Sequence, residues 1–259
     1  MSQNATQPQR VVVTAGGSGI GRATAECFLA AGARVHICDV APDMLNAALK
    51  ANPMLTGTLA DVGKPPDVER MIKEAMTKLG GIDVLVNNAG IGGPKAAVED
   101  ISYDDWDRTI AVNLNGMFYC IKQVVPGMKA QKSGCIVNIS TASARVGLPM
   151  RSPYVASKVG VLGLTYTLAR ELGPHNIRVN SILPGAIDNP RGRGLIKRFG
   201  EERGLTFEEA EAQFLGYISM GTWIDPSEIG ETAVFLASRA GRHISGQNLG
   251  VCGNLEWET

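Results

Sequence analysis

The sequence predicts an α/β fold: a doubly wound parallel β-sheet with helices on both faces. Three observations support this prediction. Short apolar runs rich in valine and isoleucine alternate with longer amphipathic segments from residue 11 to residue 252, which is typical of parallel sheets. A glycine-rich turn directly follows the first run. Polar residues or glycines follow most of the later runs, at the end of the strand where open α/β sheets bind ligands.

The composition is that of an ordinary globular protein. The 259 residues are 44% hydrophobic and 19% charged, with 25 basic and 25 acidic side chains. This balance favours neither nucleic acid nor a membrane surface as a partner, and no apolar run reaches membrane-spanning length. We expect residues 1–9, which are polar and lack the apolar core of a signal peptide, to be disordered. Five cysteines without a CxxC motif indicate reduced thiols and a cytoplasmic location.

The first predicted unit is a strand, a glycine turn, a helix and a second strand. Residues 11–13 are three valines that lead into TAGGSGIG at 14–21. An amphipathic segment at 23–31 ends at Gly32, and a second apolar run at 34–39 closes with Asp39. Such glycines let backbone N–H groups approach a pyrophosphate, and the terminal acid can bind ribose hydroxyls. The unit therefore predicts dinucleotide binding, the alternatives being a simple turn and a solvated strand end.

The alternation continues through the middle of the chain. Helical spacing at 45–51 precedes a strand at 56–59, and helical spacing at 68–79 precedes a strand at 82–86 that opens into Asn-Asn-Ala-Gly. A Gly-Gly-Pro turn leads to a long helix at 103–130, and a strand at 135–139 ends in hydroxyl side chains. The carboxyl ends of parallel strands share one edge, so we expect these polar groups to gather beside the glycine turn.

Tyr154 and Lys158 stand four residues apart at the start of a predicted helix. Apolar residues at helical spacing continue to Leu172, and Gly173-Pro174 ends the run. A free phenol is a weak acid at neutral pH, but an ammonium one turn away favours the phenolate, and a phenol so tuned can exchange a proton with a substrate oxygen. The spacing alone is common, and a solvated pair is the simpler interpretation until the other motifs are counted.

The last third of the chain interrupts and then resumes the pattern. A strand at 178–183 stops at Pro184-Gly185, and the charged segment at about 190–221 contains helical pieces at 192–199 and 207–218. We interpret this segment as a substrate lid. Its basic residues could bind an anionic substrate, although a solvated helix face is favoured: Arg191, Arg193, Lys197 and Arg198. A capped helix at 225–238 and a strand at 248–252 follow, and without a linker or repeat we predict one domain over 10–259.

Together these motifs resemble the short-chain dehydrogenase/reductase family over essentially the whole chain. The matching elements are the glycine turn, Asp61-Val62, Asn87-Asn88-Ala89-Gly90, the Asn113 of VNLNG, the hydroxyls before Tyr154, Tyr154-x-x-x-Lys158 and Pro184-Gly185. The resemblance implies a single-domain Rossmann-type fold. It also implies an oxidoreductase that interconverts a secondary alcohol and a ketone by hydride transfer, with a nicotinamide cofactor.

The resemblance assigns the catalytic roles. Tyr154 would be the general acid/base, and Lys158 would assist it and bond the nicotinamide ribose. Asn113 would hold a water that links Lys158 to solvent, whereas outside the resemblance it would bond its own helix backbone. The serine that usually orients the substrate is Thr141 here, and Ser140 is the second choice because adjacent strand residues face opposite ways.

The resemblance also assigns the cofactor contacts. A carboxylate at position 39 accepts bonds from a free 2'-hydroxyl and repels a 2'-phosphate, and neither Ser18 nor Val40 supplies a cation, so we predict NAD(H) over NADP(H). The three histidines lack metal-ligand spacing, and we predict no metal site. The expected cofactor-binding residues are Gly16, Ser18, Gly19, Ile20, Asp39, Asp61, Val62, Asn88, Ala89, Gly90, Tyr154, Lys158, Pro184, Gly185 and Ile187.

Two departures and several alternatives remain. Ala15 replaces the first motif glycine, and Cys252 replaces an acid near the chain end, where family members form subunit contacts. The expected partners are a small alcohol or ketone and further copies of the chain, as a tetramer or a dimer. The alternative activities are a 3-oxoacyl thioester reductase, a non-catalytic NAD-binding sensor and a cofactor-free lyase. Nothing in the sequence identifies the substrate.

Overall fold

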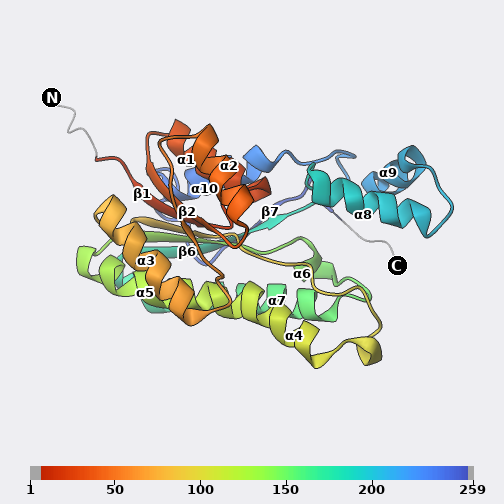
Figure 1. Ribbon diagram of the computed structural model, residues 1–259, viewed down its shortest axis with the longest axis horizontal. Helices are drawn as coiled ribbons and strands as arrows, with labels where there is room; N and C mark the ends of the chain where they lie inside the picture. Colours follow the sequence, from red (N-terminus) through yellow and green to blue (C-terminus); the bar gives the residue numbers. More distant parts are fainter. Residues whose placement is uncertain (1–6, 256–259) are drawn as a thin grey trace.

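The computed structural model describes residues 7–255 and contains one seven-stranded sheet (Figure 1). The strand order is β3-β2-β1-β4-β5-β6-β7, and every neighbouring pair is parallel. The strands are β1 (Arg10–Thr14), β2 (Arg34–Asp39), β3 (Thr56–Leu59), β4 (Val84–Asn87), β5 (Gly134–Ile139), β6 (Ile177–Pro184) and β7 (Asn248–Val251). The order reverses direction between β1 and β4, which is where doubly wound sheets bind their ligands.

Helices cover both faces of this sheet (Figure 1). One face carries α1 (Gly19–Ala30), α2 (Pro42–Ala51) and α10 (Pro226–Ala237), and the opposite face carries α3 (Pro65–Leu79), α5 (Gly116–Gln131) and α7 (Ser152–Leu172). Each face has its own hydrophobic core, one centred on Phe28 and Ile229 and the other on Met71 and Leu85. Because both faces are covered, the central strands are apolar on both faces over most of their length, as in the three buried valines of β1.

The remaining elements lie beyond the carboxyl ends of the strands or in short connections. Figure 1 shows α8 (Pro190–Glu201) and α9 (Phe207–Gly216) projecting past that edge of the sheet. The loop after β4 reaches the same region, and Lys95 of that loop forms an ion pair with Glu202 just after α8. The short elements are η1 (Val98–Asp100), α4 (Tyr103–Ile110), η2 (Ala111–Asn115), α6 (Ser143–Val146) and η3 (Gly173–His175).

The structure confirms the predicted fold class and corrects two details. The expected long helix at 103–130 is present as an unbroken helical rod, but it contains a π turn, η2, between α4 and α5. Most of the expected tail at 1–9 lies outside the described residues, but Gln9 belongs to the fold: its carbonyl accepts a bond from Arg34 and its amide donates to Ala237. Within residues 7–255, no helix is both long and apolar enough to cross a bilayer.

Candidate active site

Asp39 and the glycine turn lie side by side and together fit the adenosine side of a dinucleotide. The Asp39 carboxylate is buried, and it accepts backbone N–H bonds from Gly17 at 3.0 Å and from Ala41 at 3.0 Å. A Cβ on Gly17 would lie 2.7 Å from Asp39 Oδ2, so only glycine lets the turn approach the acid this closely. Each carboxylate oxygen keeps a second lone pair for a ligand hydroxyl.

The N-terminus of α1 is open for an anion. Its N-cap residue, Ser18, makes no side-chain capping bond and is exposed, and no acidic residue occupies the first turn. Helix N–H groups and the positive end of the helix dipole therefore face outward from the turn, as a pyrophosphate requires. Gly16 is held by the carbonyl of Cys38, Gly19 has a positive φ of 53°, and Ile20 packs on the core. These residues fit the nicotinamide dinucleotide that the sequence predicts.

Ala15 adopts the left-handed conformation that the family's usual glycine would adopt. Its φ is 50°, which costs a non-glycine residue about 1 kcal/mol or more. The surrounding contacts hold it there: the Asn88 side chain donates to the carbonyls of Thr14 at 3.0 Å and Ala15 at 3.3 Å. Thr14 in turn accepts N–H bonds from Asn88 and Ala89. Asn88 thus ties the glycine turn to the end of β4.

Tyr154 and Lys158 lie on the first turns of α7, as predicted. Within the described residues the Tyr154 hydroxyl has no hydrogen-bond partner, so it is available to a substrate oxygen. Lys158 is 4% exposed, and its Nζ donates to the carbonyl of Ile139 at 2.8 Å. Two of its three donors stay free, and Gly90 lies beside them, since a Cβ there would be 3.2 Å from Nζ. Burial, and then the nearby Arg191, lower the pKa of Lys158 to about 8.

Asn113 lies in the π turn and is fully buried. Its amide donates to the Ile91 carbonyl and to the Ser157 hydroxyl, both at 3.0 Å, and its oxygen accepts from the Ile91 N–H at 2.8 Å. The side chain therefore holds the loop after β4 against α7, and it does not bond its own helix. Both amide hydrogens are occupied, so a water placed by this side chain would donate to its oxygen, which keeps a second lone pair.

The two candidate orienting hydroxyls have different surroundings. The Ser140 hydroxyl is buried and donates to the carbonyl of Lys158 at 2.9 Å. The Thr141 hydroxyl accepts a long bond, 3.3 Å, from the Ser143 N–H, and its own hydrogen is not donated to any described residue. Thr141 therefore retains a donor for a substrate oxygen and Ser140 does not.

The other predicted cofactor residues line the same edge. Asp61 accepts from the N–H of Gly63 and pairs with Arg108 at 3.0 Å, while Val62 is buried against Gly116. Pro184 accepts from the N–H of Ala142. Gly185 leaves room for Cys252, whose Cα would lie 2.7 Å from a Cβ there, and Ile187 bridges to Ile224. Cys252 is thus a small packing residue of the strand edge. No cluster of potential metal ligands occurs in residues 7–255.

Two arginines lie close together at this site, and the sequence did not predict that they would meet. Arg151, at the start of α7, places its guanidinium 5.7 Å from the centre of the Tyr154 ring. Arg191, in the first turn of α8, lies next to Gly92: a Cβ there would be 2.9 Å from Arg191 Nη2 and 2.7 Å from Arg151 Nη2. No motif marks Arg151, and only the basic character of the segment pointed to Arg191.

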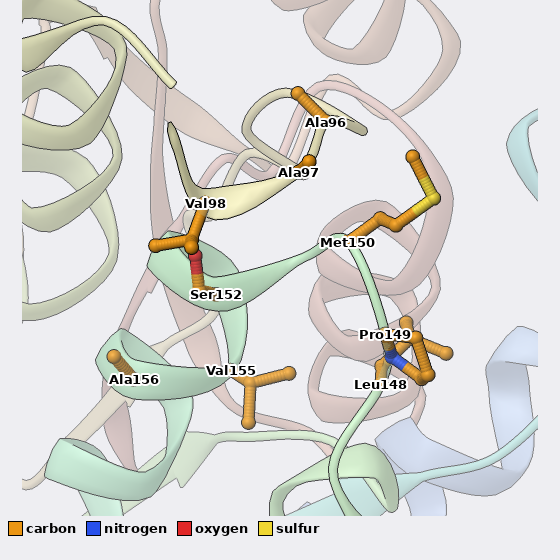
Figure 2. A pocket seen from close by; sticks show the side chains of 9 residues that line it. All are labelled: Ala96, Ala97, Val98, Leu148, Pro149, Met150, Ser152, Val155 and Ala156. Carbon is orange, nitrogen blue, oxygen red and sulfur yellow. The ribbon is translucent and has the colours of Figure 1, made fainter. Parts of the chain in front are cut away.

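An apolar cavity of about 470 Å³ lies beside this site (Figure 2). Figure 2 shows Ala96, Ala97 and Val98 on one side, Met150 on another, and Val155 and Ala156 from α7. Tyr154 and Lys158 do not line it, because residues 152, 155 and 156 share a different face of the helix. The cavity is therefore separate from the reacting groups.

Comparisons with known proteins identify the family of this chain. Residues 14–254 match the family model described as enoyl-(acyl carrier protein) reductase. The chain belongs to the short-chain dehydrogenase/reductase family. It is 36% identical over 248 residues to a 3-oxoacyl-[acyl-carrier-protein] reductase of Thermotoga maritima, covering 94% of this chain and 96% of that protein. It is 38% identical over 256 residues to trans-4-hydroxycyclohexanecarboxylate dehydrogenase of Sinomonas cyclohexanicum, covering 95% and 92%.

The solved structures of short-chain dehydrogenase/reductases show the same fold. An actinorhodin polyketide ketoreductase determined with NADPH superposes with a TM-score of 0.92 at 32% identity, covering 97% of this chain and 98% of that one. The chain is thus an oxidoreductase of a family that uses nicotinamide cofactors. The individual residue roles, the choice between NAD and NADP, the cytoplasmic location and the oligomeric state stay predictions.

Proposed function

We propose that the protein is an NAD(H)-dependent dehydrogenase/reductase that interconverts a secondary alcohol and a ketone. The observation that carries the proposal is the Tyr154 hydroxyl, which is unpartnered among the described residues and stands one helical turn from a buried lysine ammonium. The bound nicotinamide supplies or accepts the hydride. The glycine turn, the open end of α1 and Asp39 hold the dinucleotide.

The protein's own residues manage the proton and the substrate oxygen. Tyr154 gives its proton to the oxygen during reduction and takes it back during oxidation. Lys158, buried and cationic at neutral pH, stabilises the phenolate form and keeps two donors for the ribose. Thr141 donates its free hydroxyl hydrogen to the substrate oxygen, while Ser140 fixes α7 against β5. Asn113 positions the loop after β4, and its side-chain oxygen keeps a lone pair for the relay water.

NAD(H) is the proposed cofactor because of the charge beside the ribose. Asp39 is an ionisable group at the end of β2, the next residue is Val40, and the exposed position in the glycine turn is Ser18. A 2'-phosphate would meet a carboxylate without a compensating cation from these positions. The reductase structure with NADPH shows that the family also accepts the phosphorylated cofactor, so the preference has to be measured.

The test is a screen of secondary alcohols and ketones with each nucleotide, following the absorbance of the reduced nicotinamide. We include trans-4-hydroxycyclohexanecarboxylate and 3-oxoacyl thioesters, because they correspond to the two named relatives. We expect kcat/KM to be at least tenfold higher with NAD(H). The isosteric variant Asp39→Asn should narrow that preference, and a tenfold preference of the wild type for NADP(H) would overturn the assignment.

The alternative is a 3-oxoacyl thioester reductase, favoured by the 36% identity to the Thermotoga maritima enzyme. It would use the same tyrosine and lysine, so the site geometry does not distinguish it. Turnover of the thioesters above that of every free alcohol or ketone, with NADPH preferred, would establish this alternative in place of the proposal.

A further inference from the structure

Two guanidinium groups from distant segments meet beside the reacting tyrosine. Arg151 lies three residues before Tyr154, and Arg191 lies on the lid helix α8. Their Nη2 atoms both lie next to Gly92: a Cβ there would be 2.7 Å from Arg151 Nη2 and 2.9 Å from Arg191 Nη2. A side chain at residue 92 would displace both groups, so the glycine leaves room for the pair.

This pair lacks the acidic partner that several neighbouring basic residues have. On and around α8, Arg193 pairs with Asp188, Lys197 with Glu201 and Lys95 with Glu202. No ion pair or side-chain hydrogen bond joins Arg151 or Arg191 to any residue in 7–255. The Arg151 Nε is moreover a buried donor without a partner, as is the hydroxyl of the adjacent Ser152.

The positive charges of the two arginines repel each other when no anion is bound between them. Burial lowers the pKa of Arg151, as do the positive charges of Arg191 and Arg198, while Tyr154 acts in the opposite direction. Arg191 also disfavours the ammonium form of Lys158, and it stands at the positive end of the α8 dipole. Like charges held together at a partly buried site are stabilised by an anion between them.

We propose that Arg151 and Arg191 bind a carboxylate on the substrate, which makes the protein a dehydrogenase of hydroxy or oxo acids. The inference rests on the proposed function and names its substrate class. Because the Arg151 guanidinium lies 5.7 Å from the centre of the Tyr154 ring, a substrate whose carboxylate is held by the pair can extend to the Tyr154 hydroxyl. One arginine comes from the lid, so binding of the acid also fastens α8 over the loop that follows β4.

The substrate, not the cofactor pyrophosphate, is the proposed source of the anion. The pyrophosphate is expected at the open N-terminus of α1, beside Gly19, where Asn189 is the residue of the lid segment that approaches. Arg151 belongs to the start of α7 and contacts the tyrosine ring and Gly92. The experiment therefore measures both ligands in the same variants.

The test compares secondary-alcohol carboxylates, including trans-4-hydroxycyclohexanecarboxylate, with their uncharged carboxamides at saturating nucleotide. We expect Arg151→Gln and Arg191→Gln to raise KM for the carboxylates by about 10- to 100-fold, the range for lost charge-assisted hydrogen bonds. The carboxamides should show little change, and added salt should raise KM for the carboxylates only. Lys197→Gln, which removes an exposed charge from the same helix, is the matched control.

Two binding measurements separate this inference from the proposed function. Calorimetry with cyclohexanecarboxylate, which cannot be oxidised at a hydroxyl, should show binding to the wild type that both arginine variants lose. That result supports the inference even if no alcohol is turned over, in which case only the proposed function fails. If the arginine substitutions raised KM equally for the carboxylates and for the carboxamides, the inference would be overturned. A rise in the dissociation constant of NAD⁺ in the variants would also overturn it, because it would assign the pair to the cofactor.

Discussion

At the scale of single residues, Tyr154 carries the proposed proton transfer. Among residues 7–255 its hydroxyl has no hydrogen-bond partner. We predict that Tyr154→Phe lowers kcat by a factor of about 10³, within the range of general acid/base catalysis, and leaves the dissociation constant of NAD⁺ within about twofold. Stopped-flow kinetics and calorimetry measure the two quantities. Near-normal turnover in this variant would refute the assignment.

Lys158 combines a catalytic role with a cost in stability. Its buried ammonium has a pKa of about 8 compared with an ordinary 10.5, so the unfolded chain binds the proton more tightly. We predict that Lys158→Met abolishes turnover and raises the free energy of unfolding at pH 7 by about 2 kcal/mol, which is the relieved burial less one lost hydrogen bond. Urea titrations at several pH values measure this difference.

The sign of the pH dependence provides the control for Lys158. Between about pH 8 and pH 10.5 the unfolded wild type holds more protons than the folded protein, so wild-type stability rises with pH in that window. The difference in the free energy of unfolding between Lys158→Met and the wild type should therefore decrease as pH rises through this window. An exposed replacement, Lys197→Met, should change stability little at any pH. A Lys158→Met variant less stable than the wild type at pH 7 would contradict the prediction.

At the scale of elements, β2, β3 and α3 share a partly buried polar network that should make the protein sensitive to acid. His36 on β2 is 1% exposed and bonds Thr56 and Thr58 of β3, and Thr58 donates to Glu74 of α3. Burial lowers the pKa of His36 from 6.5 to about 4. Because the unfolded histidine takes up a proton first, this contribution to stability is present above pH 6.5 and lost as pH falls to 4.

We predict that His36 alone accounts for a loss of roughly 3 kcal/mol in the free energy of unfolding between pH 6.5 and pH 4. The variant His36→Gln should flatten that part of the stability profile, measured by urea unfolding. His243 is exposed, and His243→Gln serves as the matched control that leaves the slope unchanged. If the free energy of unfolding fell equally steeply between pH 6.5 and pH 4 in His36→Gln and in the wild type, groups other than His36 would cause the loss of stability.

Most elements could be predicted from the sequence because burial leaves a direct pattern. The strands of a covered parallel sheet are apolar on both faces, and the predicted strand at 34–39 coincides with β2. Helix starts were placed late, at 45 and 68, because Pro42 and Pro65 open α2 and α3 before the first apolar residue. The π turn escaped prediction because apolar spacing records which residues are buried, not a local shift of helix phase.

The site was predictable where a motif reports a chemical requirement and unpredictable where a contact is purely spatial. The glycine turn, Asp39, Tyr154 and Lys158 could be named because their spacing in the chain reflects their geometry. Arg151 and Arg191 come from separate segments, and their meeting at Gly92 depends on how α8 lies beside the loop after β4. No periodicity encodes that approach.

At the scale of the whole molecule, exposed apolar side chains on α7 and α5 support the expected homo-oligomer. Val159 and Tyr166 are 44% and 53% exposed on one face of α7, and Phe118 of α5 is 48% exposed. We predict a solution mass that is a dimer or tetramer of the 27.4 kDa chain, measured by sedimentation equilibrium. Val159→Glu with Tyr166→Glu should reduce that mass. Met54→Glu, which charges an exposed site elsewhere, should not, and a monomeric wild type would refute the prediction.

The π turn limits how the chain can change in length. Each residue advances an α-helix by about 100°, and a π turn absorbs one surplus residue without breaking the rod. Removing one residue from 111–115 would therefore restore regular α-helical spacing and leave Cys120 and Val124 facing the interior, but it would move Asn113 from its present position. We expect homologous sequences that keep Asn113 to keep the length of this five-residue stretch as well.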